Sequence, residues 1–339
     1  MSGHTGNPPG LDLERLSGWF TAMVPEAGRE LSARLLTGGK SNLTYEIGDG
    51  ARTWILRRPP LGHVLATAHD MGREYRVMSA LRDTEVPVPR MYALCQDEEP
   101  LGAPFYVMER VSGTPYRYAK DLAGFGPART RALSSAMVGT LAELHAVDPA
   151  AVGLTDFGRP QGFLDRQVHR WRKQLDASHS RELPAAEELF ERLAARVPEE
   201  SAFAIVHGDY RLDNLLVDAG DRITAVLDWE MATLGDPLTD LALMLVYHRL
   251  AVLGAGDADA CLAPGFLTEE EIIERYAEQR EPARFGFYLG LASFKLAVIL
   301  EGIHYRHRHG QTVGQGFERV GESVVPILEA GLQSLEEYR

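Results

Sequence analysis

The sequence predicts an α+β protein of two lobes, a five-stranded sheet with one helix followed by a mostly helical lobe. The chain of 339 residues is longer than one compact core usually is. Short β-type runs split by turn signals fill residues 31–111, whereas most long segments after about residue 128 have the helical period. We therefore expect a ligand site in a cleft between the lobes.

Residues 1–30 are predicted to form a tail and a leading helix, and residues 31–111 the N-terminal lobe. The predicted strands of that lobe are "LSARLLT", "NLTYEIG", "RTWILRR", "RMYALCQ" and "PFYVMERV", with a helix over 66–81 after the third strand. The composition changes near "ERVSGTP", so residues 112–339 form the predicted C-terminal lobe. Its helices are expected at 128–147, 163–178, 185–196, 236–253, 268–280, 284–304 and 316–336, with short strands at 203–206, 215–218 and 223–228.

The composition excludes several classes of protein. The chain has 35 basic and 48 acidic residues, a net charge of −13, which argues against nucleic acid as the main partner. Two cysteines, Cys95 and Cys261, are too few for a disulfide framework or a zinc site. The N-terminus lacks a signal-peptide pattern, and runs such as "DLALMLVYHRLAVLGAG" are too short and too charged for a membrane span. We expect a cytoplasmic protein without a membrane partner. The sequence does not indicate its oligomeric state.

The segment "FAIVHGDYRLDNLLVD" places polar residues between two strand patterns. His207, Asp209 and Asn214 fit H-x-D-x-x-x-x-N, the spacing of the kinase catalytic loop. In that loop the Asp accepts the proton of the substrate hydroxyl and the Asn binds a metal. Arg211 has the planar fork that suits a transferring phosphoryl group. The alternative is a structural loop in which Asp and Asn cap backbone amides.

A second acidic segment, "RITAVLDWEMATLGDPLTD", follows this loop. Asp228 ends an apolar strand and is a candidate Mg²⁺ ligand, since Mg²⁺ prefers carboxylate, phosphate and water oxygens. Glu230 is either an outer ligand or a solvated turn residue. Asp236 and the following proline are predicted to begin a helix. Asp240 is either a surface acid in its first turn or a support for the catalytic loop.

Candidate phosphate-binding groups lie in the N-terminal lobe. The turn in "LLTGGKSNLTYEI" includes Gly39, Ser41 and Asn42 and exposes backbone N–H groups that can cradle phosphates, although an ordinary hairpin turn is the alternative. The strand "TWILRR" ends in Arg57 and Arg58. Alternation along a strand directs only one of the two inward, and we favour Arg57 from its place after "IL".

The helix that follows supplies a partner for that arginine. Met71, Glu74, Met78 and Leu81 fall on one stripe, so a carboxylate interrupts an apolar seam. Such a carboxylate is costly unless it is paired, and the arginine on the preceding strand is the expected partner. The alternative is that Glu74 reaches solvent at the edge of the helix.

Together these segments resemble the aminoglycoside/choline-kinase-like phosphotransferases, a branch of the protein-kinase-like fold. The resemblance covers about residues 31–310 and is carried by "GGKSNLTYEI", "ILRRPP", Glu74, "VMERVSG", "VHGDYRLDNLL" and "LDWEMATLGDPLTDLALM". It is strongest to the subgroup fused to acyl-CoA dehydrogenase domains in animals. The resemblance implies a bilobal kinase-like fold that uses ATP and Mg²⁺.

The resemblance also implies roles for individual residues. Asp209 would be the catalytic base, and Asn214 and Asp228 the Mg²⁺ ligands. Arg57 or Arg58 would anchor phosphate together with Glu74, and a hinge from Glu109 to Val111 would offer backbone groups to adenine.

The acceptor follows less directly, because substrates of the resembling family range from aminoglycosides and choline to hydroxyacyl-CoA. The acidic stretches have the pattern of solvated helix faces. Two basic clusters suit an anionic acceptor if they face the site, and otherwise complement helix ends. They comprise His304, Arg306, His307, Arg308 and His309, and Arg166, Arg170, Arg172 and Lys173.

We therefore predict an ATP- and Mg²⁺-dependent small-molecule O-phosphotransferase with an anionic hydroxyacyl acceptor. An aminoglycoside phosphotransferase is the alternative within the same class. A non-catalytic nucleotide-binding pseudokinase and a metal-dependent hydrolase using His207, Asp209 and Asp228 are the alternatives from other classes. The choice between ATP and GTP stays open.

Overall fold

The computed structural model describes residues 7–337 except 26, 37–41, 63–68, 179, 200–202, 255, 257 and 312–316. The chain folds into two compact units. The first unit contains residues up to 113 together with 216–218 and 224–230, and the second contains the remainder. The predicted lobe boundary lies two residues before this division. No pattern in the sequence indicated that the two later segments belong to the first unit.

The first unit is built on a five-stranded antiparallel sheet of order β1-β2-β3-β5-β4. The predicted number of strands and the single helix between the third and fourth strands are confirmed. The elements are α1 (Leu13–Met23), β1 (Ser32–Leu36), β2 (Leu43–Gly48), β3 (Thr53–Arg58), α2 (Met71–Leu81), β4 (Met91–Cys95) and β5 (Phe105–Glu109).

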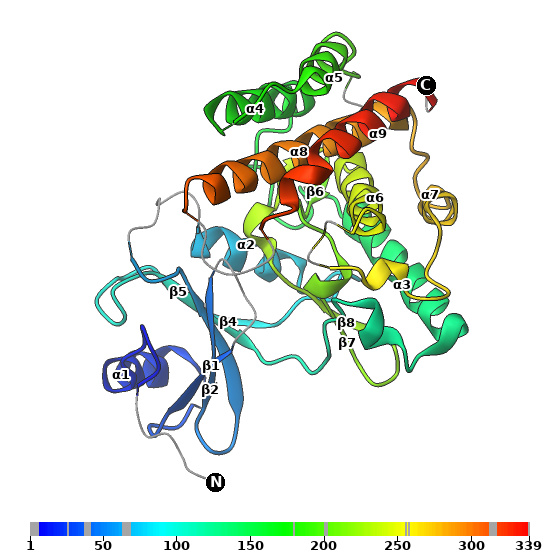
Figure 1. Ribbon diagram of the computed structural model, residues 1–339. Coiled ribbons are helices and arrows are strands. Elements are labelled where there is room, and N and C mark those ends of the chain that lie inside the picture. The colour runs from blue at the N-terminus through cyan, green and yellow to red at the C-terminus, as the bar shows by residue number, and fades with distance from the viewer. Residues whose placement is uncertain are drawn as a thin grey trace. The chain divides into compact units, whose positions relative to one another are not determined.

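Helices α1 and α2 pack with side chains from opposite faces of this sheet (Figure 1). Phe20 of α1 meets Trp54 of β3 edge to face, with ring centroids 5.3 Å apart. Helix α2 begins at Met71, five residues later than predicted, because the side chain of Asp70 accepts a hydrogen bond from the Arg73 N–H and caps the helix there. Of the predicted start, residues 66–68 lie outside the described range.

The second unit is mainly helical, with α8 and α9 lying side by side (Figure 1). Its helices are α3 (Gly126–Ala146), α4 (Phe163–Ser178), α5 (Pro184–Ala194), α6 (Leu238–Val252), α7 (Glu269–Ala277), α8 (Phe285–Arg308) and α9 (Val324–Glu337). The short strands are β6 (Ala204–Val206), β7 (Leu215–Val217), β8 (Ile223–Val226) and β9 (Thr233–Gly235). Strand β6 pairs antiparallel with β9 in the second unit. Strand β7 pairs with β8, and most residues of these two strands belong to the first unit.

The last helix and the last strand differ from prediction. Helix α9 begins at Val324 rather than at residue 316, after a 3₁₀ turn over Val320–Ser323. Strand β9 was not predicted, because its three residues, Thr-Leu-Gly, do not form an apolar run like those of β6 and β7.

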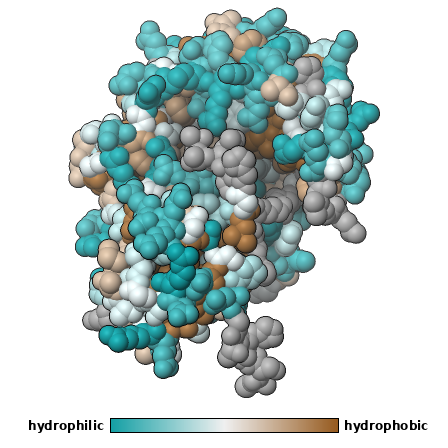
Figure 2. Space-filling view, turned by 90° about the vertical axis from the view of Figure 1, so that its left-hand side faces the viewer, coloured by the Kyte–Doolittle hydropathy of each residue, from teal (hydrophilic) through white to brown (hydrophobic). Residues whose placement is uncertain are grey.

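Helix α8 is long and apolar enough to cross a membrane by length and composition alone. However, 83% of its most apolar window is buried inside the protein, as expected for the core helix of the second unit. The face of the molecule in Figure 2 is mainly hydrophilic, with hydrophobic side chains in scattered places.

Candidate active site

An ion cluster in the first unit is centred on Arg57, at the end of β3. Its guanidinium lies 3.3 Å from Glu74 Oε2 on α2 and donates to Asp228 Oδ1 at 2.5 Å. The side chain of Glu74 is buried, whereas that of Asp228 is 30% exposed. The predicted pairing of Glu74 with a strand arginine is therefore confirmed, and the arginine is Arg57.

Arg58 points to the opposite face of the sheet, as strand alternation requires. Its guanidinium donates to the backbone carbonyls of Gly10 and Leu101, the latter at 2.9 Å. Arg58 is itself buried among these groups and ties chain segments together. We therefore remove Arg58 from the proposed nucleotide site and keep Arg57.

Two further polar groups surround Glu74. The Tyr106 hydroxyl donates to Glu74 Oε2 at 3.0 Å, and Asn42 Nδ2 donates to Glu74 Oε1 at 3.1 Å. The same Asn42 amide lies 3.3 Å from Glu230 Oε2, and a ring nitrogen of His69 lies 2.8 Å from Asn42 Oδ1. Asn42 therefore links the predicted Gly-Gly turn to the ion cluster. Gly39 and Ser41 lie outside the described residues.

Burial raises the pKa of Glu74 to about 7, against the opposing influence of Arg57 and the Tyr106 hydroxyl. When folding raises the pKa of a carboxyl group, the folded protein is most stable, relative to the unfolded chain, at a pH low enough for the group to be protonated in both the folded and the unfolded state. That contribution is lost as the pH rises from the ordinary value of 4.5 to about 7.

We expect Glu74→Gln to remove this part of the pH dependence. From about pH 5 to about pH 8, wild type should lose more free energy of unfolding than the variant, because the amide does not titrate. Urea unfolding at the two pH values measures this difference. Glu14→Gln, a change of an exposed acid in α1, should follow wild type. Equal losses in wild type and Glu74→Gln would contradict the assignment.

Asp228 follows β8 in a left-handed conformation, with φ of 66°. Non-glycine residues with positive φ are uncommon and concentrate at functional sites, although Asp adopts this conformation more readily than most. The predicted hinge residues also lie in this unit. The N–H of Glu109 donates to the Arg90 carbonyl at 2.8 Å, and Val111 follows β5. The assignment of Glu109 and Val111 to an adenine-binding hinge stays a prediction.

The loop carrying Asp209 lies in the second unit, and its carboxylate is held on both sides. The Tyr247 hydroxyl on α6 donates to Asp209 Oδ1 at 2.6 Å. Asn214 Nδ2 donates to the Asp209 carbonyl at 2.9 Å and lies 3.3 Å from Oδ2 of the same residue. The predicted Asp and Asn are thus in contact across the loop.

Arg211 occupies the same loop but is directed toward another acid. Its guanidinium donates to both carboxylate oxygens of Asp213, at 3.0 and 2.5 Å, and packs over the Tyr247 ring. Arg211 therefore stays a candidate for contact with the transferring phosphoryl group, although in this structure its guanidinium is paired with Asp213.

The backbone entering the loop is fixed by Asp240 of α6. Its carboxylate accepts from the N–H of His207 at 2.6 Å and of Gly208 at 2.8 Å, and lies 3.3 Å from His145 Nε2. Gly208 has φ of 83°, and a Cβ there would lie 2.8 Å from the Met231 side chain, so only glycine fits. Asp240 is 1% exposed, which settles its two predicted alternatives in favour of loop support.

Although burial opposes ionisation, hydrogen bonds to His145 and to the loop backbone hold the pKa of Asp240 below its usual value. We expect Asp240→Asn to lower the free energy of unfolding by about 3 kcal/mol, because it removes a buried charge with several partners. Urea denaturation measures the loss. Glu270→Gln, which changes an exposed acid in the first turn of α7, is the control. A loss in Asp240→Asn no larger than in this control would contradict the support role.

The oxygen atoms of the predicted metal-binding residues suit a hard cation such as Mg²⁺, most of whose ligands would be phosphate and water oxygens. The side-chain nitrogen of Asn214 donates to Asp209, so the side-chain oxygen of Asn214 can coordinate a cation. Within the described part of the chain, no three His, Cys, Asp or Glu side chains gather at metal-ligating distances. Mg²⁺ needs only one or two protein ligands when phosphates and water complete its shell, whereas a hydrolytic metal centre needs more.

The predicted basic clusters lie in different surroundings. His304, Arg306, His307, Arg308 and His309 occupy the last turns of α8 and the residue after it. On α4, Arg172 pairs with Asp176 and Glu187, whereas Arg170 lines a cavity beside the catalytic loop.

Sequence reasoning missed two residues at this loop. Tyr247 lies inside an apolar helical pattern that gives no sign of its contact with Asp209. Lys295 donates to the Gly208 carbonyl at 3.0 Å. A single lysine inside the apolar run "FGFYLGLASFKLAVIL" was a signal that could have identified it.

Comparison with known proteins assigns the chain to a family of phosphotransferases. The model described as "Phosphotransferase enzyme family", APH, matches residues 32–278, and the chain belongs to this family.

Three similar proteins illustrate the match. The chain is 36% identical over 317 residues to acyl-CoA dehydrogenase family member 11 of Gallus gallus, covering 89% of this chain but only 40% of that relative. A crystal structure of a Ralstonia eutropha protein that bears the name of an aminoglycoside phosphotransferase is 34% identical, with a TM-score of 0.84 over 97% of this chain and 99% of that one.

A thermostable mutant of the aminoglycoside phosphotransferase APH(4)-Ia, bound to ADP and hygromycin B, shares the fold at 17% identity. Its TM-score is 0.63, over 95% of this chain and 98% of the other. The predicted kinase-like fold and the predicted family are thus confirmed.

Proposed function

We propose that this protein transfers the γ-phosphate of ATP, with Mg²⁺, to the hydroxyl group of an anionic hydroxyacyl compound. The observation that carries the proposal is the Asp209 carboxylate, held by Tyr247 and Asn214 on a loop that Asp240 supports. A carboxylate so fixed can accept the proton of a hydroxyl as that oxygen attacks phosphorus.

The nucleotide side of the proposal rests mainly on residues of the first unit, together with Asn214 of the second. Arg57 is the proposed phosphate anchor, oriented by Glu74, and Asp228 and Asn214 are the proposed Mg²⁺ ligands. Mg²⁺ would neutralise charge on the transferring phosphates. ATP is favoured as the donor because a related fold binds ADP.

The acceptor class rests on two observations. A relative that this chain partly covers carries the name of an acyl-CoA dehydrogenase, which suggests that the same pathway handles acyl compounds. In addition, the basic side chains of Arg170 and Lys295 line a cavity beside the catalytic loop.

The test is Mg²⁺-dependent release of ADP from ATP by the purified chain. The acceptors are hydroxy fatty acids, their CoA thioesters, choline and kanamycin. Stimulation by a hydroxyacyl compound alone is the expected result. Stimulation by kanamycin alone would replace the proposed acceptor with an aminoglycoside. Nucleotide binding with no stimulation by any acceptor would favour a pseudokinase.

A further inference from the structure

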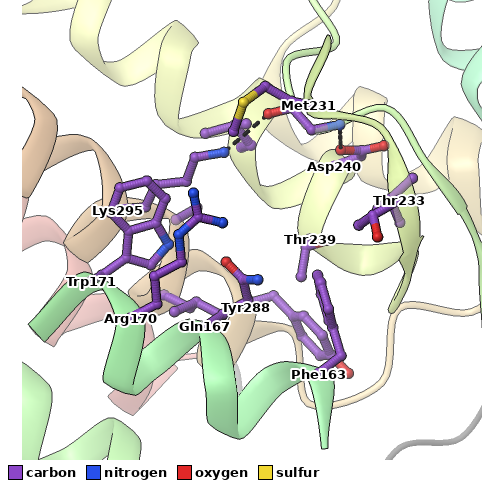
Figure 3. Close-up of a pocket in the computed structure, with 15 residues that line it drawn as sticks. Phe163, Gln167, Arg170, Trp171, Met231, Thr233, Thr239, Asp240, Tyr288 and Lys295 are labelled. Atoms are coloured by element: carbon purple, nitrogen blue, oxygen red, sulfur yellow. Dashed lines mark hydrogen bonds between the residues drawn. The ribbon is translucent and has the colours of Figure 1, made fainter. Parts of the chain in front are cut away.

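A cavity inside the second unit lies between α4, α6 and α8, beside the catalytic loop (Figure 3). Its volume is about 80 Å³, which exceeds that needed for one water molecule and suits the polar end of a small molecule. Gly208, the residue before Asp209, forms part of its wall. A molecule bound here would therefore contact the loop that carries the proposed base, although the Asp209 side chain is not among the lining residues.

Two cations are directed into this cavity. Lys295 Nζ uses one of its three protons on the Gly208 carbonyl and lies 5.7 Å from the centre of the Trp171 ring. The Arg170 guanidinium lies over the same ring, 5.4 Å from its centre, and Figure 3 shows it pointing toward the cavity. Among the described residues, none accepts a hydrogen bond from the Arg170 guanidinium.

The cavity offers these cations little negative charge. Among its described lining residues Asp240 is the one carboxylate, and its oxygens already accept from the backbone of His207 and Gly208. Burial lowers the pKa of Lys295, and the neighbouring Arg170 adds to this effect, against Asp209 and Asp240. The remaining wall is largely apolar and includes Phe163, Leu243, Leu291 and Ala292. A cation pair over an apolar wall is suited to an acyl group with an exposed oxygen.

We propose that this cavity binds the acceptor and that Arg170 and Lys295 hold its acyl oxygen. That oxygen is either the carboxylate of a free hydroxy acid or the carbonyl of its thioester. This inference rests on the proposed phosphotransfer and narrows its substrate. Because Gly208 directly precedes Asp209, the hydroxyl of the acceptor lies only a few bonds from the bound oxygen. Polycationic aminoglycosides are disfavoured because Arg170 and Lys295 repel them.

The test compares Arg170→Gln with Arg172→Gln, a change on the same helix at an arginine already paired with acids. The probes are 3-hydroxybutyrate and 4-hydroxybutyrate, each as the free acid and as the CoA thioester. For the acceptor that stimulates ADP release, Arg170→Gln should raise KM about tenfold or more, because a charge-assisted hydrogen bond is lost. The KM for ATP should stay unchanged, and Arg172→Gln should match wild type. Arg170→Lys should recover part of the loss.

The arms with free acid and thioester distinguish the two forms of the acyl oxygen. Stimulation of wild type with an unchanged acceptor KM in both Arg170→Gln and Lys295→Met would overturn this inference and leave the phosphotransfer intact. Stimulation of wild type by none of these probes, or by kanamycin alone, would overturn the proposed hydroxyacyl acceptor and this inference with it. Thermal unfolding of each variant checks that it is folded.

Discussion

Asp209→Asn should reduce the turnover number about 10³-fold, because an amide cannot accept the proton of the attacking hydroxyl. The affinity for Mg²⁺-ATP should stay close to that of wild type, since the proposed base acts on the acceptor. The Tyr247 hydroxyl could still donate to the amide oxygen of the substituted side chain, and Asn214 would keep its hydrogen bond to the backbone carbonyl of residue 209, so the loop should hold its shape. Acceptor-stimulated ADP release and equilibrium binding of nucleotide measure the two quantities.

Asp213→Asn is the matched control for this substitution. Asp213 lies on the same loop, four residues later, and its carboxylate binds Arg211. This control should lose less than about tenfold in turnover, since one charged contact is altered and no proton transfer is removed. Equal losses in the two variants would show that Asp209 acts only through loop structure. Loss of nucleotide affinity in Asp209→Asn would likewise contradict its role as base.

Arg57→Met should weaken the binding of Mg²⁺-ATP about tenfold or more. The proposed phosphate anchor loses a charge and a bidentate fork, and such hydrogen bonds are the stronger ones in proteins. Burial lowers the pKa of Arg57, but its acidic neighbours Glu74 and Asp228, with Tyr106, raise it overall, so the group is a permanent cation. Isothermal titration with a non-hydrolysable ATP analogue measures the affinity.

Arg58→Met is the natural comparison, because the two arginines are adjacent on one strand. Arg58 binds two backbone carbonyls, so this substitution should lower the free energy of unfolding by about 2 kcal/mol. Its nucleotide affinity should match wild type. If Arg58→Met weakened nucleotide binding and Arg57→Met did not, the assignment of the anchor would be reversed.

The ion pair between Arg57 and Glu74 is a part of the candidate site that could be predicted from the sequence. A carboxylate on an apolar helical stripe needs a cationic partner, and the strand before the helix offers one. Alternation restricts that partner to one of two neighbouring residues, and the structure shows Arg57. The strands of the first unit are similarly readable, because they are short apolar or alternating runs separated by turn residues such as Gly, Asp and Pro.

Other features depend on distant parts of the chain and leave no local pattern. Asp240 has the same sequence context whether it is a surface acid or a buried acceptor, and only the approach of residues 207–208 decides between them. Arg170 and Arg172 are equivalent in sequence, yet acids on α4 and α5 engage only the second. The basic cluster at residues 304–309 is the more conspicuous pattern in the sequence, but it is Lys295, nine residues before His304 on the same helix, that contacts the catalytic loop.

The most direct test of the central claim is to identify the product formed by the purified chain with ATP, Mg²⁺ and the acceptor that stimulates ADP release. Mass spectrometry and treatment with hydroxylamine distinguish a phosphate on a hydroxyl from one on a carboxyl group. The proposed phosphotransfer predicts a hydroxylamine-resistant phosphomonoester of the acceptor that requires Mg²⁺ and is absent with Asp209→Asn. A hydroxylamine-sensitive acyl phosphate, or free phosphate with unmodified acceptor, would contradict it.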